Sequence, residues 1–498
     1  MPEPSTRPWS SEDDKFHEEC GVFGVWNAAD AAALAALGLH ALQHRGQEAA
    51  GIVSLDEAGI FHSHKGQGLV GDNFSDPKVM NSLRGRAALG HNRYATTGET
   101  ALRNVQPLYA DFAFGGFAVA HNGNLTNAHG LRRALVQRGC LFQSTTDSEV
   151  FVHLIAISLY STVVDRLIDA LKQVQGAYSL VALHNGALIG ARDPLGVRPL
   201  VLGRLGGAPG EAEGAPGWVL SSETCALDIV GAEFVRDIDP GEIIVIDGAG
   251  VHSVKPFGRQ NQERFCIFEY IYFARPDSVV EGTPVYETRK RIGAELARES
   301  GVPADVVVPV PDSGVPAAMG YAAEAGIPFE LGIIRNHYVG RTFIEPTDQI
   351  RNLGVKLKHS ANRPALEGKR VVLVDDSIVR GTTSRKIVEM VRAAGAREVH
   401  MRISSPPTTH SCHYGIDTPE RAKLMAAQHD LEEMARIIGV DSLAFISLDG
   451  LYRALGKPGR DMERPGYCDA CFTGDYAIPL TDAMGNADRQ LSLLQVSQ

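Results

Sequence analysis

Cys20 opens the segment CGVFG, directly after a short acidic, proline-containing leader. A cysteine thiolate can attack the carbon of a side-chain amide, form a thioester and release ammonia. If the bond after Glu19 is cut, Cys20 carries a free α-amine. The ordinary pKa of such an amine, about 7.7–8.0, suits it as general base for its own thiol, so no distant histidine is needed. Taken alone, a cysteine beside glycine can equally be a small buried hydrophobic residue.

Further segments carry groups that amide hydrolysis at such a thiol would use. They are LQHRGQEAAGI (42–52), HNRYATTG (91–98), HNGNLTN (121–127) and STTDSE (144–149). The side-chain amide of Asn122 and the backbone N–H of Gly123 can stabilise a developing oxyanion. Recognition of free glutamine needs a cation for its carboxylate and an anion for its ammonium, and Arg93 and Asp147 can supply them.

Each of these residues also has an ordinary structural explanation. Arg93 can be a surface arginine, Asn122–Gly123 a turn, and Asp147 the N-cap of a helix. In this order after Cys20, the segments resemble the glutaminase domain of class II amidotransferases, which are N-terminal-nucleophile hydrolases. The resemblance implies a four-layer αββα domain over residues 20–258. It also implies that residues 1–19 are a propeptide, whose removal exposes the nucleophile.

A second constellation lies in VVLVDDSIVRGTTS (371–384), where two acids and a loop of small and hydroxyl residues follow an apolar strand. Ligands of parallel sheets bind at the carboxyl ends of strands, where Asp375 and Asp376 are expected. These carboxylates suit ribose hydroxyls, directly or through Mg²⁺. The loop that follows would offer N–H groups and hydroxyls to a phosphate at a helix N-terminus. Its residues are Gly381, Thr382, Thr383 and Ser384. The alternative is a plain strand–turn–helix with Thr382 as N-cap.

The same segment resembles the 5-phosphoribosyl-1-pyrophosphate (PRPP) binding motif of type I phosphoribosyltransferases. The resemblance implies that the loop PVPDSG (309–314) meets the pyrophosphate, so Ser313 is a candidate contact to Mg²⁺ or phosphate. The segment RNHYVGRTFI (335–344) contains Gly340 with cations on both sides. It is either a mobile lid over an anion or a surface loop.

Four cysteines form a third constellation. Cys468 and Cys471 make a C-x-x-C pair, whereas Cys266 and Cys412 stand far apart in the sequence. Four thiolates suit an iron–sulfur cluster or structural zinc, and a C-x-x-C pair can also be redox-active. All four resemble the ligands of a structural [4Fe–4S] cluster found in one branch of a family of glutamine-using enzymes.

Two parts of the chain differ in pattern. Residues from about 20 to 258 read as short strands with glycine turns and helices over 31–43, 131–139 and 148–160, which predicts layered α and β structure. The following residues alternate apolar strands with glycine-ended helices, as in ADVVVPV before DSGVPAAMGYAAEAG, which predicts a parallel sheet over 259–498.

Length and composition limit the function classes. A chain of 498 residues is too long for one ordinary core, and 44% hydrophobic with 21% charged residues is typical of soluble globular proteins. The formal charge of −11 argues against nucleic-acid binding, and no apolar run is long enough to span a membrane. The leader lacks the features of a secretory signal, and seven dispersed cysteines are no disulfide framework, so we expect a cytoplasmic protein. Cys140 and Cys225 are expected to be packing residues.

Taken together, the chain from Cys20 to about Tyr476 resembles the iron–sulfur branch of the glutamine–PRPP amidotransferase family. The resemblance implies that glutamine, PRPP and water give 5-phosphoribosylamine, glutamate and pyrophosphate, the first committed step of purine synthesis, with internal ammonia transfer. It also implies Mg²⁺, a homotetramer and inhibition by purine nucleotides. Two alternatives are a class II amidotransferase with another acceptor and a PRPP-sensing regulator without catalysis.

Overall fold

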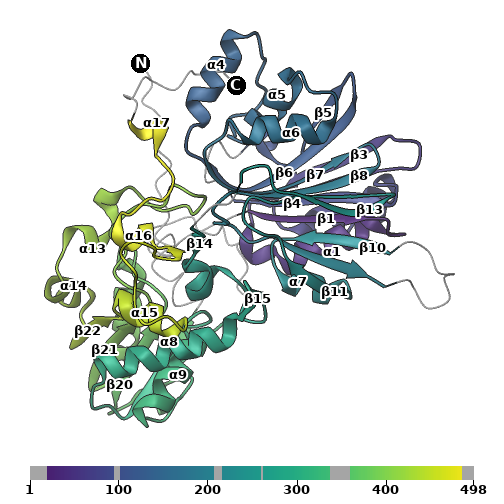
Figure 1. The fold of residues 1–498 in the computed structure, drawn as a ribbon. Coiled ribbons are helices and arrows are strands. Elements are labelled where there is room, and N and C mark those ends of the chain that lie inside the picture. Colours follow the sequence, from purple (N-terminus) through teal and green to yellow (C-terminus); the bar gives the residue numbers. More distant parts are fainter. Residues whose placement is uncertain (1–19, 95–100, 207–215, 259–261, 337–358, 485–498) are drawn as a thin grey trace, which may run out of the picture.

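The computed structural model describes residues 20–94, 101–206, 216–258, 262–336 and 359–484. The expected propeptide (1–19) and Gly340, in the segment interpreted as either a lid or a surface loop, lie outside these residues. Figure 1 shows two bodies in contact: a β-sandwich with helices on its outer faces, and a part built on a parallel sheet. We call them the sandwich half (β1 to β13) and the parallel-sheet half (β14 to α16).

The first sheet of the sandwich half is antiparallel and has seven strands. Its central strand β1 (Gly21–Trp26) pairs with β4 (Ala87–Arg93) on one side and β10 (Gly217–Ser221) on the other. Beyond these lie β2 (Ala49–Leu55) and β3 (Phe61–Gln67) at one edge, and β9 (Val201–Leu205) and β11 (Ala232–Asp237) at the other. Strands β1, β2 and β4 are buried almost throughout, because helices cover one face of this sheet and a second sheet covers the other.

The second sheet is also antiparallel and has six strands. In spatial order they are β13 (Gly250–Val254), β12 (Ile243–Asp247), β8 (Ala187–Arg192), β7 (Gly176–His184), β6 (Gly115–Leu125) and β5 (Leu108–Phe112). Apolar side chains of the two facing sheets, among them Val22, Leu89, Val181 and Leu220, form one buried cluster. Their burial holds the sheets face to face, because removing apolar surface from water is the main driving force for such packing.

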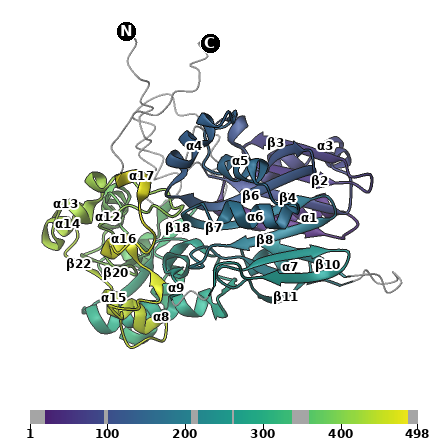
Figure 2. The same cartoon turned by 45° about the horizontal axis from the view of Figure 1, so that its top comes forward.

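Helices cover the outer faces of the sandwich. On the first sheet lie α1 (Ala31–Ala41), α7 (Thr224–Ile229), α2 (Val70–Phe74) and α3 (Pro77–Ser82), and on the second α4 (Ala128–Gln137), α5 (Glu149–Ile157) and α6 (Val163–Leu171). The 3₁₀ turns are η1 (Gln43–Arg45) and η2 (Leu102–Asn104). The four-layer αββα order expected for this part is confirmed, and Figure 2 shows the stacked layers. The helix predicted over 131–139 begins earlier, at Ala128.

The parallel-sheet half is built on four parallel strands, as predicted. In order they are β17 (Val306–Pro309), β20 (Arg370–Asp375), β21 (Glu398–Ile403) and β22 (Ser442–Phe445). One face carries α12 (Thr382–Ala393), α13 (Met425–Gln428) and α14 (Leu431–Ile438), and the other α8 (Val285–Ser300), α9 (Val315–Ala325) and α15 (Leu448–Ala454). Val306 and Val308 face the first layer and Val307 the second, as the period of a strand requires.

Shorter elements connect the two halves and surround the sheet. They are β14 (Phe265–Cys266) with β23 (Tyr467–Cys468), β15 (Val279–Val280) with β16 (Thr283–Pro284), β18 (Ile333–Arg335) with β19 (His359–Ala361), η3 (Glu269–Phe273), η4 (Arg421–Lys423), α11 (Arg363–Leu366), α16 (Ala470–Thr473) and α17 (Thr481–Met484). In Figure 1, α17 leaves the parallel-sheet half and lies beside α4. Among the described residues, no helix is both long and apolar enough to cross a bilayer.

Helices α8 and α9 cross at two glycines. A Cβ on Gly293 would lie 1.8 Å from the carbonyl oxygen of Ala317, and one on Gly320 would lie 1.9 Å from that of Lys290. Both obstacles are backbone atoms of the partner helix, which cannot rotate away. The two backbones approach so closely only because neither residue has a side chain.

Replacement of Gly293 by alanine should therefore destabilise the parallel-sheet half. Because the added methyl group must push two packed helices apart, we expect Gly293→Ala to lower the free energy of unfolding by about 1–3 kcal/mol. The measurement is the urea midpoint of the purified protein. Gly71→Ala in α2 is the control, since nothing lies within 4 Å of its added Cβ. Equal midpoints for both variants would contradict the close crossing.

Candidate active sites

Cys20 directly precedes β1 and is 7% exposed. Its Sγ donates to the carbonyl oxygen of Tyr94 at 3.6 Å. Strand β1 fixes this position, because Gly21 pairs with Asn92 at the end of β4 where Arg93 also lies. The cysteine is therefore held at the edge of the central strand of the sheet, beside the segment 91–94.

The pKa of Cys20 shows which charges lie within its reach. Burial raises the pKa of this thiol, Arg93 lowers it, and Asp147 and Glu48 raise it again. The structure thus brings together Cys20, Arg93 and Asp147, as the sequence predicted. Arg93 is only 3% exposed, and its Nη1 donates to the carbonyl oxygen of Asn104 at 2.9 Å, so the explanation as a surface arginine is wrong.

Asn122 and Gly123 lie inside β6 rather than in a turn, so that alternative is wrong too. Asn122 is fully buried, and neither its Oδ1 nor its Nδ2 has a hydrogen-bond partner among the described residues. A buried amide without partners is costly, which favours a role toward a ligand. Gly123 has φ +138°, and a Cβ there would lie 2.1 Å from the carbonyl oxygen of Ala177, so the position accepts only glycine.

Asp147 does not cap a helix. The N-cap of α5 is Ser148, and no side chain accepts a hydrogen bond there. Instead Oδ2 of Asp147 accepts the backbone N–H of Leu125 at 2.9 Å, and Oδ1 accepts the hydroxyls of Thr146 and Ser148 at 3.2 and 3.3 Å. These bonds fix the carboxylate against the end of β6, the strand that also carries Asn122.

A cavity of about 300 Å³ opens beside Asp147. Its walls come from both halves of the molecule and include His129, Arg132, His413 and Asp482, none of which the sequence analysis identified. Asp482 accepts the N–H groups of His129 and Gly130 at the start of α4, which is why that helix begins earlier than predicted. No local pattern could reveal this wall, because Asp482 lies 353 residues from His129.

The second constellation lies at the carboxyl end of β20, as predicted. Asp375 and Asp376 are each 1% exposed. Asp375 accepts the N–H of Asp376 at 2.9 Å, and Asp376 accepts the hydroxyl of Ser377 at 2.6 Å and that of Ser313 on its other oxygen. Ser313 follows the neighbouring strand β17, so adjacent strand ends bring the serine and the acid pair together.

The loop after these acids ends at Gly381, which has φ +78° and is the N-cap of α12. Thr382 is therefore the first residue of the helix, and its assignment as N-cap is wrong. At the helix start, Thr382 is exposed, Thr383 half-buried and Ser384 buried. The first N–H groups of a twelve-residue helix thus lie just beyond the acid pair, in an arrangement that favours an anion.

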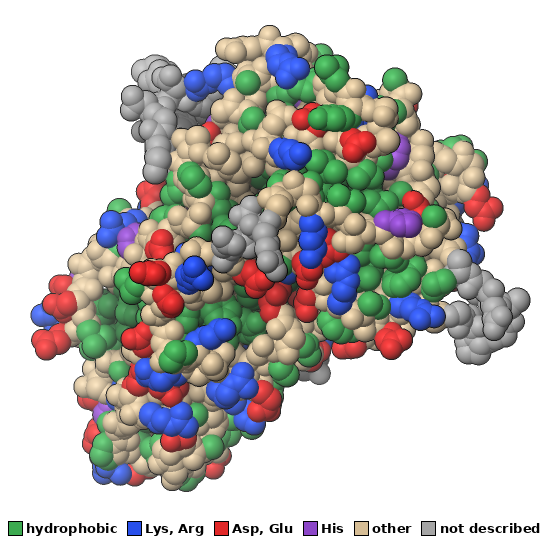
Figure 3. Space-filling model, in the orientation of Figure 1, with side chains coloured by type: hydrophobic (Ala, Val, Ile, Leu, Met, Phe, Trp, Pro, Cys, Tyr) green, Lys and Arg blue, Asp and Glu red, His purple; other side chains and the backbone are tan. Residues whose placement is uncertain are grey.

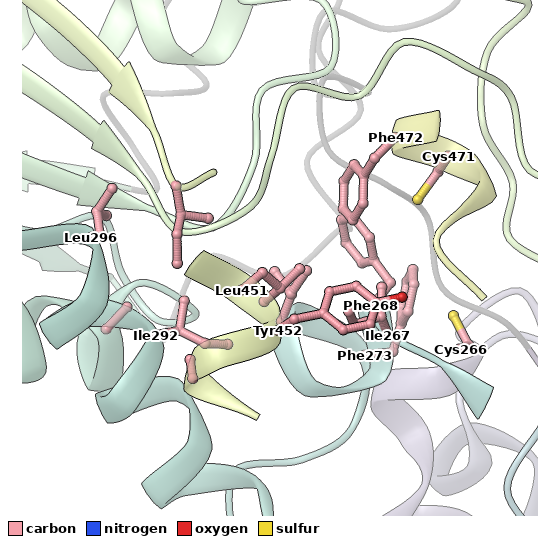
Figure 4. Packing of buried hydrophobic residues seen from close by; sticks show 14 of the residues in the cluster. Cys266, Ile267, Phe268, Phe273, Ile292, Leu296, Leu451, Tyr452, Cys471 and Phe472 are labelled. Carbon is pink, nitrogen blue, oxygen red and sulfur yellow. The ribbon is translucent and has the colours of Figure 1, made fainter. Parts of the chain in front are cut away.

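The four cysteines of the third constellation converge where the two halves meet. Cys266 and Cys468 pair across the parallel strands β14 and β23, and the N–H of Tyr414 donates to Sγ of Cys412 at 3.3 Å. Burial and, to a smaller extent, neighbouring cysteines including Cys412 together raise the pKa of Cys266 and of Cys468 to about 12. In Figure 4, Cys266 and Cys471 lie at the edge of a cluster of buried aromatic rings.

The same thiols interact electrostatically with one another. Burial raises the pKa of Cys471, and Cys266, Cys412 and Cys468 each raise it further. Among the described residues, no group of three or more potential ligands could hold a single metal ion. The two other cysteines lie apart from these four: Cys225 is buried in α7, where its Sγ donates to Oε2 of Glu223 at 3.7 Å, and Cys140 packs on the outer face of the second sheet.

Known proteins resemble this chain over almost its whole length. Family models for a glutamine amidotransferase domain and a phosphoribosyl transferase domain match residues 91–212 and 284–404. Amidophosphoribosyltransferase of Rhizobium etli is 58% identical over 488 residues, which are 97% of this chain and 96% of that protein. The protein of the same name from Bacillus subtilis is 48% identical over 462 residues, 93% of this chain and 94% of that protein.

A solved structure has the same fold. The glutamine phosphoribosylpyrophosphate amidotransferase from B. subtilis complexed with ADP and GMP matches with a TM-score of 0.86 at 46% identity, and the match covers 95% of this chain and 99% of that chain. The two constellations lie on two sheets in the same chain, and relatives share both parts in the same order. The chain therefore belongs to the amidophosphoribosyltransferase family.

Proposed function

We propose that the chain releases ammonia from glutamine in residues 20–258 and joins it to PRPP in residues 259–498. Water, glutamine and PRPP become glutamate, 5-phosphoribosylamine and pyrophosphate, the first committed step of purine synthesis. The observation that carries the proposal is that one chain holds two separate constellations. In one, Cys20 lies within electrostatic reach of Arg93 and Asp147, and in the other the acid pair Asp375 and Asp376 precedes a helix N-terminus.

At the first site, Cys20 is the nucleophile. Burial raises the pKa of the thiol, so the thiol carries its proton at neutral pH and needs a base. The α-amine freed by removal of residues 1–19 takes that proton. The thiolate attacks the amide carbon, the unpartnered amide of Asn122 and the N–H of Gly123 stabilise the oxyanion, and ammonia leaves. Water then hydrolyses the thioester to glutamate, which Arg93 and Asp147 hold by its carboxylate and ammonium groups.

At the second site, the residues bind and orient PRPP. Asp375 and Asp376 hold the ribose hydroxyls, and residues 381–384 bind the 5-phosphate at the N-terminus of α12. Mg²⁺, held by Asp375, Asp376 and Ser313, would neutralise charge on the pyrophosphate. The two buried carboxylates and the hydroxyl beside them are oxygen donors, which fits this ion. Ammonia attacks the anomeric carbon, and the bond from that carbon to pyrophosphate breaks.

Contacts between the halves support internal transfer of ammonia. A Cβ on Gly415 would lie 2.9 Å from Cα of Gly123, so the segment around Gly415 packs on the oxyanion strand itself. The Nδ2 of Asn124 also donates to the carbonyl oxygen of His413 at 3.0 Å. The place where ammonia forms is therefore covered by the half that would use it.

We further propose that Cys266, Cys412, Cys468 and Cys471 hold a structural [4Fe–4S] cluster. A tetrahedral zinc with Zn–S bonds of about 2.3 Å would hold its sulfurs only about 3.8 Å apart. Support for a shared group is that the four thiols interact electrostatically and that Cys266 and Cys468 pair on adjacent strands. The cluster would tie β14 and β23 to the segment around Cys412. It would not take part in the reaction.

The remaining proposals concern the protein in the cell. We expect a cytoplasmic homotetramer that is inhibited by purine nucleotides. Support for nucleotide binding is that the B. subtilis structure is a complex with ADP and GMP, and that a second matching structure, 47% identical with a TM-score of 0.87, is an allosteric regulatory enzyme of purine biosynthesis.

Substitution of the nucleophile separates the two sites. With Cys20→Ser, we expect glutamine-dependent pyrophosphate release to fall by at least about 10³-fold, because a hydroxyl is a much poorer nucleophile. Release supported by free ammonia should persist, because the second site is intact. Pyrophosphate and glutamate are both measured with PRPP and Mg²⁺ present. Full glutamine activity would contradict the assignment, and glutamate without pyrophosphate in the unmodified protein would indicate another acceptor or a sensor.

Substitution of the acid pair should affect both nitrogen donors. We expect Asp376→Asn to lower pyrophosphate release about 100-fold or more with glutamine and with ammonia, because a neutral amide cannot replace a carboxylate toward Mg²⁺ or hydroxyls. Asp305→Asn is the matched control, since Asp305 forms a surface ion pair with Arg370 at the opposite end of β20. Equal activities for the two variants would contradict the proposed PRPP site.

The cluster proposal predicts how much iron and acid-labile sulfide the purified protein contains. Protein purified without oxygen should be brown and contain about four iron atoms and four acid-labile sulfides per chain. Cys468→Ser should lose most of both, whereas Cys225→Ser should keep them, because Cys225 lies in α7 away from the other thiols. Bound zinc without sulfide would overturn the proposal.

A further inference from the structure

A network of buried charges joins the two halves of the molecule. Arg45 of η1 and Glu269 of η3 are 1% and 0% exposed, and they form a two-pronged ion pair with N–O distances of 3.2 and 2.6 Å. Arg198 of the sandwich half also donates to Glu269, at 3.3 Å, and to the carbonyl oxygen of Tyr414, at 3.1 Å. The surface around this buried network is also charged: on the face drawn in Figure 3, acidic and basic side chains gather where the halves meet.

Glu223 binds the Nε atom of Arg45, whereas Glu269 binds its two terminal nitrogens. Its Oε1 accepts from Arg45 and lies 2.6 Å from Nε2 of His44, and its Oε2 accepts the N–H of Arg275 at 2.8 Å and the hydroxyl of Ser278 at 2.7 Å. Burial opposes ionisation of Glu223, but Arg45 and His44 hold the pKa of this carboxyl well below its ordinary value. Two carboxylates and two guanidinium groups are thus buried together, with His44 beside Glu223, in a set whose members come from both halves.

The sandwich end of this network lies close to the residue that follows the candidate nucleophile. A Cβ on Gly21, the residue after Cys20, would lie 3.5 Å from the Cβ of Arg45. On the other side, a Cβ on Gly46 would lie 2.9 Å from the carbonyl carbons of Asn92 and Arg93. Arg45 is therefore in contact with the start of β1, and its neighbour Gly46 with the end of β4, which together carry Cys20 and Arg93.

The other end of the network leads toward the acid pair. Glu269 begins η3, and the buried Arg289 of α8 donates to the carbonyl oxygens of Tyr270 and Ala274 at 2.9 and 2.7 Å. Burial lowers the pKa of Arg289 to about 10, and the charge of Asp376 acts against that shift. One arginine thus holds both ends of η3 and interacts with a carboxylate of the second site.

We propose that Arg45 and Glu269 are positioning residues that align the ammonia-releasing strand with the half that consumes ammonia. The proposal rests on the two-site function given above. Buried ion pairs add little net stability, but they admit few alternative arrangements, because any shift leaves a buried charge without its partner. A displaced contact would leave both sites able to react and would let ammonia escape before it reaches the anomeric carbon.

The test measures glutamate and pyrophosphate together, with saturating glutamine, PRPP and Mg²⁺. The unmodified protein should form them in a ratio near one. Glu269→Gln, which keeps the shape and removes the charge, should raise the ratio of glutamate to pyrophosphate at least about threefold. Pyrophosphate release with free ammonia should stay within about twofold of the unmodified protein.

A matched control is Glu242→Gln. Glu242 is also 1% exposed and also binds an arginine with both oxygens, Arg236 at 2.8 and 2.6 Å, but both residues lie in the sandwich half. In Glu242→Gln, the ratio of glutamate to pyrophosphate should stay near one. An unchanged ratio in Glu269→Gln, or an equal fall of glutamine- and ammonia-supported release, would overturn the positioning role.

Two further outcomes remain distinguishable. If Glu269→Gln does not fold, Arg45→Lys takes its place, because it keeps the charge but loses the two-pronged geometry, and an unchanged ratio in that variant would overturn the proposal. If the unmodified protein forms no pyrophosphate with either nitrogen donor, the proposed function itself has failed.

Discussion

Strand β1 is the element on which the rest of the structure depends. It lies at the centre of the seven-stranded sheet, is buried on both faces, and begins at the residue after Cys20. A reactive group at the end of such a strand cannot move without disrupting the pairing with β4 and β10 and the packing between two sheets. The second site follows the same rule, because Asp375 ends a buried strand of a parallel sheet. Both sites thus have key residues that are positioned by the ends of buried strands.

The interface between the halves is held differently from either core. Each core is dominated by apolar side chains, whereas the contact near η3 contains two buried carboxylates and two buried guanidinium groups. Desolvation of such groups costs free energy that their attraction barely returns. An apolar contact tolerates small sliding, while this one fixes a single register between Arg45 and Glu269. The cost is understandable if the relative placement of two sites matters more than the strength with which the halves adhere.

Sequence reasoning succeeded where the chemistry is local. The strand, the two acids and the small residues of 371–384 are contiguous, so their placement on β20 and α12 followed from pattern alone. Both halves were also predicted as layered structures of the right kind. Two structural alternatives failed for equally physical reasons. Thr382 was considered as an N-cap, yet Gly381 with its positive φ takes that position, and Asp147 bonds to Leu125 rather than to its own helix. Contacts such as Arg45 with Glu269, 224 residues apart, leave no trace in local spacing.

The position of Asp482 at the start of α4 has a consequence for how the chain is made. A ribosome adds about 5–20 residues per second, so this wall of the cavity is synthesised roughly 20–70 s after the helix that it completes. By then the strands of the parallel sheet have all been made. The sandwich half, although it is synthesised first, therefore cannot complete this cavity until the strands of the parallel sheet have also been made. Before Asp482 is added, the cavity beside Asp147 lacks one wall. A nascent chain would therefore have an incomplete glutamine site for as long as it has no half that can accept the nitrogen.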